Sequence, residues 1–397
     1  MNIREPMKPS SAHVALPVLQ LGMRPFYLGG ALFASIALAF WLAALHGWPY
    51  AGRDAAMAGL IWHVHEMIFG FVAAIVVGFL LTAVRAWTSR DTLQGAPLGA
   101  LWLLWAVGRV LIWSGPEWAG AVVDSLFLPA TAFVLLRVLI SVRSRLNVFL
   151  PVELALLGGL NVMFHVSVMI GRSDLALHTA YAATGVIVFF VVVITGRIVP
   201  MFTVNAIPGF AMRRFRAVDA MAAPFVMLTL FADAFGASAA VVTGAACVTA
   251  LLHAVRIASW RSWRVGNRPI VWILHASCLW IPVGFAMLGL SAAGVVPHSL
   301  AVHALAVGAI GGAVVAMITR TALGHTGRKL AAGGWEQACY WLVIGAAVSR
   351  VFGPLLPSVP YMVWLDVAGA CWIGTFAAYT IRYFPYLWSP GADERPD

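Results

Sequence analysis

Long apolar stretches of about 20 residues recur along the whole chain and are separated by short polar segments, and a helix of that length is what a bilayer core requires. The pattern predicts an all-α polytopic membrane protein. A single membrane domain (residues 23–385) follows a cytoplasmic N-terminal segment (residues 1–22) and precedes a cytoplasmic tail (residues 386–397). The twelve predicted transmembrane helices are residues 26–46, 57–84, 96–114, 119–140, 149–171, 174–196, 217–235, 237–257, 269–291, 299–320, 335–356 and 360–383.

The overall composition supports a membrane protein and excludes a soluble domain. Hydrophobic residues make up 62% of the chain and charged residues only 10%, and the mean hydropathy is +0.90. The first 20 residues are polar and contain proline, so we expect no cleaved signal peptide. The four cysteines form no CxxC pair, which argues against a disulfide framework or a thiolate metal site (Cys247, Cys278, Cys339 and Cys371).

The net charge of +10 is explained by topology and does not indicate nucleic-acid binding. If both termini are cytoplasmic, nearly all of the 25 Lys and Arg residues lie in or beside cytoplasmic segments. The exceptions are Arg53, Arg172 and Arg350 near the outer side and Arg109 within a span. Such an excess of basic residues on one side is the positive-inside pattern, which predicts the orientation in the lipid bilayer.

Three markers recur at a nearly constant offset and predict an internal repeat. AVGRV (106–110) corresponds to AVSRV (347–351), Asp124 to Asp366, and His63 to His303. His178 in the sixth span supplies a middle copy of the histidine. We therefore predict three units of four helices. This is also the plan of the haem–copper oxidase catalytic subunit, although the histidine pair that those oxidases carry on helix 7 is absent here.

Five histidines are predicted to lie at one level, in the outer third of the membrane. Imidazole is a common ligand of haem iron and of copper, although a single membrane histidine is more often a hydrogen-bonded packing residue. Two histidines separated by one residue on a helix point to nearly opposite sides, so His63 and His65 cannot readily chelate one ion. The candidate metal ligands are His63, His65, His165, His178 and His303.

Other polar residues accompany these histidines. Glu66 shares a helix face with His63, and Tyr181 shares one with His178, so both are candidate catalytic residues for proton transfer. Glu66 has the alternative of pairing with Arg109. Two interpretations stay open for Arg109 and Arg350, which could pair with Asp124 and Asp366 or hold the propionates of a haem.

A second group is predicted near the inner face and contains His253, His275, His325, Arg197 and Arg320. It is accompanied by GRIVPMFTVN (196–205) and TRTALGHTGRK (319–329), whose Gly and Pro content predicts re-entry or a tight turn at the interface. Its candidate uses are a quinol site, a second haem or proton entry. Packing alone, with the arginines placed by topology, is the alternative.

Several motifs resemble the NnrS family over residues 22–385. The matching segments are RPFYLGGALFA (24–34), WHVHEMIFGF (62–71), GFLLTAV (78–84), GRIVPMFTVNA (196–206) and HALAVGAIGGAVVAMITRTALGHTGRKL (303–330). The resemblance implies a bacterial inner-membrane protein that binds haem, of b type, and copper and takes part in nitric oxide metabolism and nitrosative-stress defence. The family usually has Arg at the position of Val204, which puts a charge role there in doubt.

Three functions fit these features. The leading hypothesis is a redox protein whose haem and copper bind nitric oxide near the periplasm and reduce it, with electrons from a quinol or another donor. The second is a non-catalytic haem-based sensor or scavenger of nitric oxide, which would use the same ligands. The third is a transporter of metal or small molecules, which the apolar middles of the second, sixth and tenth spans disfavour.

Overall fold

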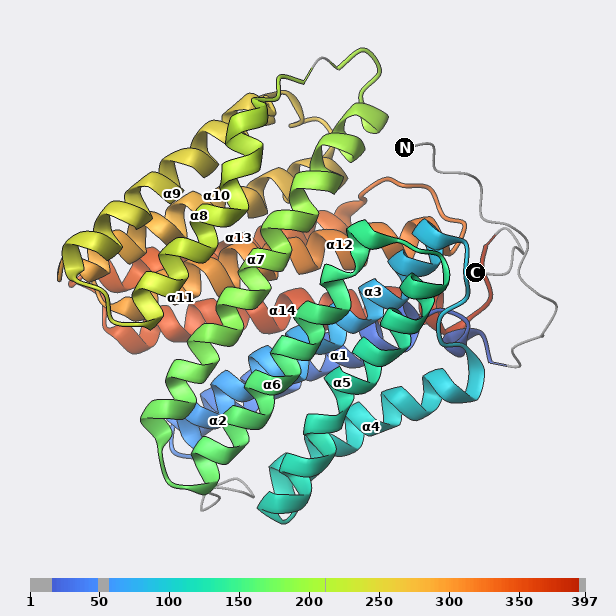
Figure 1. Ribbon diagram of the computed structural model, residues 1–397, viewed down its shortest axis with the longest axis horizontal. Coiled ribbons are helices and arrows are strands. Elements are labelled where there is room, and N and C mark those ends of the chain that lie inside the picture. The colour runs from blue at the N-terminus through green and yellow to red at the C-terminus, as the bar shows by residue number, and fades with distance from the viewer. Residues whose placement is uncertain (1–15, 49–56, 211, 393–397) are drawn as a thin grey trace. The chain divides into compact units, whose positions relative to one another are not determined.

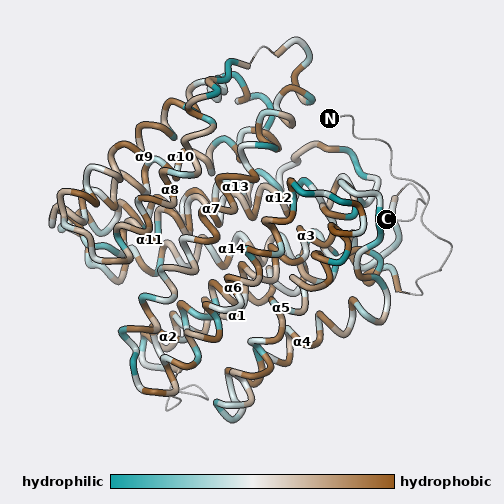
Figure 2. The backbone as a smooth tube through the Cα atoms, viewed as in Figure 1, coloured by the Kyte–Doolittle hydropathy of each residue, from teal (hydrophilic) through white to brown (hydrophobic). Residues whose placement is uncertain are grey.

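The computed structural model describes residues 16–48, 57–210 and 212–392, and within these ranges all regular structure is helical (Figure 1). Twelve helices are long and apolar enough to cross a membrane, which confirms the predicted twelve-helix membrane protein. Apolar residues dominate these helices, and many of the polar residues lie in the segments that connect them (Figure 2). Residues 1–15, Arg53 and residues 393–397 of the predicted termini and loops lie outside the described ranges.

The candidate spans follow the predicted ones closely, and several are longer. They are Met23–Leu45, Gly59–Thr88, Gly95–Ser114, Glu117–Ser141, Arg145–Met169, Ser173–Ala206, Arg216–Ala234, Ala239–Arg264, Pro269–Ala292, His298–His325, Gly334–Leu355 and Tyr361–Trp388.

Individual elements are named as in Figure 1. The α-helices are α1 (Met23–Leu45), α2 (Gly59–His65), α3 (Ala73–Thr88), α4 (Gly95–Ser114), α5 (Glu117–Ser141), α6 (Phe149–Met169), α7 (Ser173–Ala206), α8 (Arg216–Ala234), α9 (Ala239–Ser259), α10 (Pro269–Ala292), α11 (His298–His303), α12 (Gly312–His325), α13 (Gly334–Phe352) and α14 (Tyr361–Trp388). Short 3-10 turns are η1 (Pro17–Leu19), η3 (Arg145–Asn147), η4 (Ser262–Arg264) and η6 (Gly353–Leu355), and η2 (Glu66–Val72) and η5 (Ala304–Gly311) are π-helical.

The chain divides into two compact units. Unit 1 consists of residues 1–183, 321–329 and 379–397, and unit 2 of residues 184–320 and 330–378. In unit 1, α1 packs on α3, and α5 packs on both α4 and α6. In unit 2, α9 packs on α8 and α10, and η5 packs on α10 and α13. The division is into two parts, so the haem–copper oxidase-like arrangement of three four-helix units stays a prediction.

Two π-helical segments interrupt the second and tenth spans at corresponding positions. Segment η2 begins three residues after His63, and segment η5 begins one residue after the matching His303, so the two segments overlap in the repeat. The shared irregularity supports the duplication that the paired motifs predict. A π-helical turn contains an extra residue and is frequent at functional sites. In η2 the carbonyl of Gly70 accepts a hydrogen bond of 2.8 Å from the indole Nε1 of Trp105 on α4.

The prediction of re-entry or a tight turn at residues 196–205 is wrong, because these residues continue helix α7 to Ala206 with Pro200 inside the helix. Proline cannot donate a backbone hydrogen bond within a helix. Gly196, one turn earlier, has no side chain, and the guanidinium of Arg256 occupies the space that a Cβ would fill. In TRTALGHTGRK the helix continues to His325, and Gly327 then adopts φ +69° and makes the predicted turn.

Candidate metal centre

Six polar residues of unit 1 are buried together and are called here the polar cluster: His65, Glu66, Arg109, Asp124, Asn161 and His165. Each is at most 6% exposed. His65 ends α2, Glu66 begins η2, and the other members lie on α4, α5 and α6. Because a buried polar group is costly unless it finds partners, a cluster of this size is stable only as a connected network.

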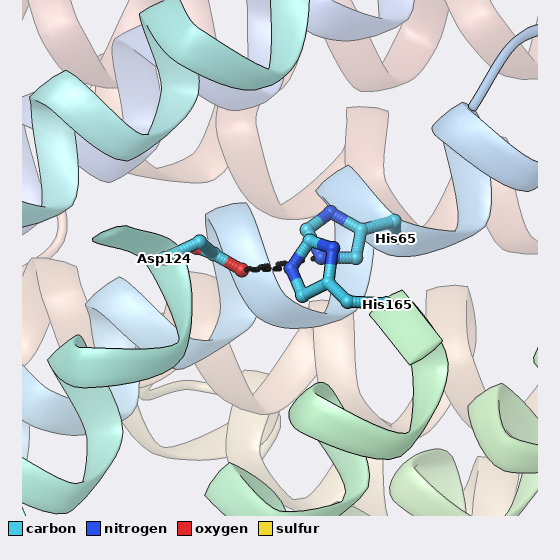
Figure 3. Close-up of side chains that lie close together, drawn as sticks. All are labelled: His65, Asp124 and His165. Carbon is cyan, nitrogen blue, oxygen red and sulfur yellow. Dashed lines mark hydrogen bonds and ion pairs between the residues drawn. The ribbon is translucent and has the colours of Figure 1, made fainter. Parts of the chain in front are cut away.

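Asp124 is the centre of the network. Its Oδ2 lies 2.9 Å from Nε2 of His165 and 3.2 Å from Nε2 of His65 (Figure 3). The same oxygen accepts a hydrogen bond of 2.7 Å from the Asn161 amide nitrogen. The sequence predicted Asp124 only as the partner of Arg109, and in the structure it also joins two histidines.

Arg109 connects the two carboxylates of the cluster. Its Nη1 donates a 2.6 Å hydrogen bond to Oε2 of Glu66, and its Nη2 is ion-paired with Oδ1 of Asp124. Both predicted pairings of Arg109 are therefore confirmed. Since Arg109 is already engaged by two protein carboxylates, the structure favours the pairing over a role in holding a haem propionate.

The ring of His65 has a hydrogen-bond acceptor at each nitrogen. Its Nδ1 lies 3.2 Å from Oε1 of Glu66, and its Nε2 lies 3.1 Å from Oδ1 of Asn161. A protonated imidazole donates at both nitrogens and satisfies both contacts.

Three residues of the cluster could hold a metal ion. One ligand atom each of His65, Asp124 and His165 lies within 4.8 Å of the others, and all three residues are buried. Imidazole and carboxylate are ligands of Zn, Cu and Fe. Arg109 supplies one positive charge against the two carboxylates of Glu66 and Asp124, so a cation bound there would compensate the remaining negative charge. The donor set therefore fits a metal ion.

The structure brings together two of the five histidines predicted at one level. His65 and His165 meet, with ring centroids 4.8 Å apart. His63 stacks on Trp41 at 4.0 Å, on another side of the helix, as the His-x-His spacing predicts. His178 is exposed, its Nδ1 lies 2.8 Å from the carbonyl oxygen of Asp174, and its ring lies 6.4 Å from that of Tyr181.

His303 belongs to unit 2, where its Nδ1 lies 2.6 Å from the carbonyl oxygen of Ser299. The described residues of unit 1 therefore do not contain a group of all five histidines. The physical reason is that depth fixes the level of a side chain along the membrane normal and leaves its direction around the helix open. Ligand roles for His63, His178 and His303 stay predictions.

The predicted pairing of Arg350 with Asp366 is wrong. The guanidinium of Arg350 instead lies over the ring of Tyr361, with 5.7 Å between its central carbon and the ring centroid. Among the described residues its Nη1 has no hydrogen-bond partner. The two copies of the repeated Arg motif thus differ in their surroundings.

The predicted inner-face group is distributed over both units. In unit 2, the ring nitrogens of His275 lie 2.9 Å from Oγ1 of Thr203 and 2.7 Å from Oγ of Ser262. Nε2 of His253 lies 3.4 Å from the Ala222 carbonyl oxygen. These bonded rings are what the packing interpretation expects. Arg320 lies 3.9 Å over the ring of Phe202, Arg197 is exposed on α7, and His325 belongs to unit 1.

Asn161 is not among the residues predicted from the sequence, and it hydrogen-bonds both His65 and Asp124. Its position did carry a signal, because Asn161 precedes His165 by four residues and so lies on the same face of α6. A polar amide one turn from a membrane histidine is a reason to include it in a candidate site.

The fold and the site together define a twelve-helix membrane protein with a buried histidine–carboxylate centre held by an ion-paired arginine. The model of the NnrS protein family matches residues 17–390, nearly the whole chain. The chain belongs to the NnrS family, which confirms the resemblance, and this membership fits a role related to nitric oxide. A comparison with curated proteins found no match.

Proposed function

We propose that the protein binds a copper ion at His65, Asp124 and His165 and that the metal binds nitric oxide, in the inner membrane of a bacterium. The observation that carries the proposal is the group of three ligand-type side chains, all buried and within 4.8 Å of one another. Family membership supplies the link to nitric oxide. When bound, the metal would supply an open coordination position for a small diatomic molecule.

The remaining residues of the cluster orient the ligands. Glu66 fixes the ring of His65 through Nδ1, and Asn161 holds the carboxylate of Asp124. Groups that hydrogen-bond metal ligands in this way set ring orientation and ligand basicity. Arg109 pairs with both carboxylates and keeps Glu66 ionised, so Glu66 can accept a hydrogen bond from Nδ1 of His65 over 3.2 Å. Reduction of nitric oxide would need electrons from a quinol or another donor together with protons, and Glu66 is the candidate proton carrier.

Haem binding is proposed at His178 or His303. In each residue Nδ1 is hydrogen-bonded to the backbone carbonyl one turn earlier. This contact selects the neutral tautomer with its lone pair on Nε2, which is the usual preparation of a histidine ligand. These rings therefore fit axial ligation of a b-type haem, with Tyr181 beside His178 as a candidate proton donor.

Metal content tests the copper site. In full-length protein purified in detergent, we expect His65→Ala and His165→Ala each to lower bound copper about tenfold or more, as loss of one ligand removes several kcal/mol of binding. His298→Gln is the matched control, because His298 contacts Asp233 outside the cluster. Variants that elute as folded monodisperse protein and keep wild-type copper would overturn the assignment.

Consumption of nitric oxide separates turnover from simple binding. Purified protein with excess reductant should consume many equivalents if it is an enzyme. Uptake that stops at one or two equivalents per protein would support the sensor or scavenger alternative. Glu66→Gln distinguishes the two further, because it removes a proton carrier and should slow turnover more than binding.

A further inference from the structure

Arg350 on α13 carries a positive charge in a buried position. Its side chain is 8% exposed, and its Nη1 has no acceptor among the described residues. The guanidinium lies over the ring of Tyr361, which is itself 50% exposed. A buried charge without a counter-charge is costly, so such a group is expected to have an anionic partner in the working protein.

The other copy of the repeat shows what kind of partner a guanidinium at this position takes. Arg109 occupies the corresponding place in AVGRV and binds two carboxylates, one of them from Glu66, the first residue of the π-helical segment η2. The corresponding segment η5 has the sequence ALAVGAIG and contains no carboxylate, and Ala306 stands opposite Glu66 in the repeat. Arg350 also makes no ion pair with Asp366 within the described residues. Unit 2 therefore contains the arginine of the repeat, but among the described residues it has no acid in the place of those that pair with Arg109 in unit 1.

A second donor lies at the same end of this helical hairpin. The indole Nε1 of Trp364 is buried and has no acceptor among the described residues. Trp364 packs against Gly353, which follows Arg350 by one turn. Buried hydrogen-bond donors normally have an acceptor. The lack of one at both Arg350 and Trp364, which belong to the same hairpin, therefore requires an explanation.

We propose that Arg350 binds a planar anion with two oxygens, of the carboxylate class, which approaches by displacing the ring of Tyr361. The fork of the guanidinium matches two such oxygens, and Trp364 supplies a further donor. The anion can come from two sources, a free small anion or a carboxylate of a bound organic cofactor. The site lies in unit 2 and does not depend on metal binding at His65, Asp124 and His165.

Anion titration of the purified full-length protein tests this site. Sodium acetate and sodium nitrite replace sodium chloride at constant ionic strength, and thermal unfolding is recorded. For a free anion we expect a saturable rise in Tm with acetate or nitrite that is lost in Arg350→Gln. Arg350→Lys keeps the charge and loses the fork, so its affinity should fall about tenfold. Arg268→Gln, at an exposed arginine of the same unit, should respond like wild type.

The second source gives a different result. If a cofactor carboxylate fills the site, added anions leave the Tm unchanged, and Arg350→Gln purifies with about tenfold less cofactor by absorption spectrum. Trp364→Phe keeps an aromatic ring and removes the N–H, so it should weaken the binding of either anion. It replaces Arg350→Gln as the test variant if Arg350→Gln does not fold. An absent anion response in wild type together with unchanged cofactor content in the Arg350 and Trp364 variants would overturn the proposal.

Discussion

Replacing Arg109 by Gln tests whether one guanidinium holds the polar cluster together. The substitution leaves Glu66 and Asp124 buried at 1% and 2% exposure without their shared counter-charge. Each ion pair is worth about 4 kcal/mol at a charge separation of about 4 Å and an effective dielectric of about 20. Protonation of one carboxylate limits the loss, so we expect destabilisation of about 3–5 kcal/mol, the range found when one partner of a buried pair is removed.

The measurement is unfolding of the purified protein by SDS in mixed micelles, with the free energy taken from the midpoint and slope. The expected loss lowers the ratio of folded to unfolded protein by roughly 100- to 4,000-fold. Arg137→Gln is the control, because Arg137 is exposed on α5 and its loss should change the unfolding free energy by less than about 0.5 kcal/mol.

A double substitution adds a stricter condition. Asp124→Asn removes one of the two carboxylates that Arg109 binds, so in the Arg109→Gln background it should cost less than it does alone, by about 1–3 kcal/mol of coupling. An Arg109→Gln protein within about 1 kcal/mol of wild type, or two strictly additive substitutions, would refute the reasoning that the cluster is an electrostatic unit.

Two further predictions follow from the same contacts. Gly70→Ala places a Cβ 2.5 Å from Oε2 of Glu66, so it should destabilise the protein by about 1–3 kcal/mol in the same unfolding assay. Gly159→Ala is the control, because a Cβ at Gly159 has no other atom within 4 Å, and it should be neutral or slightly stabilising. Trp105→Phe leaves the Gly70 carbonyl without its 2.8 Å hydrogen bond and should cost about 1–3 kcal/mol.

The pairings inside one hairpin could be predicted only in part. The sequence placed Arg109 and Asp124 on neighbouring helices, and the ion pair is present. The same reasoning failed for Arg350, because its motif is nearly identical but the residues packed around it are not. An acid at the right position in the chain is a partner only if the neighbouring helix turns it towards the arginine.

The position of the site also depended on a local irregularity. Residues after the π-helical segment η2 are rotated relative to those before it, compared with an uninterrupted α-helix. Hydrophobic periodicity at 3.6 residues per turn cannot show such an insertion, since every residue of the segment is compatible with either helix. The faces shared by His63, Glu66 and the later residues of this span were therefore fixed only in the structure.

The hydrophobic pattern by itself determined the twelve membrane-spanning helices, since a bilayer core sets both their length and their composition. The sequence also determined that His63 and His65 point to different sides, because one residue of separation on a helix turns a side chain through roughly 200°. Only the tertiary structure decided that His65 meets His165, Asp124 and Asn161. These contacts depend on how α2, α5 and α6 are rotated about their axes when they pack. Such rotations are set by contacts between helices, and the amino-acid sequence alone does not show which residues make those contacts.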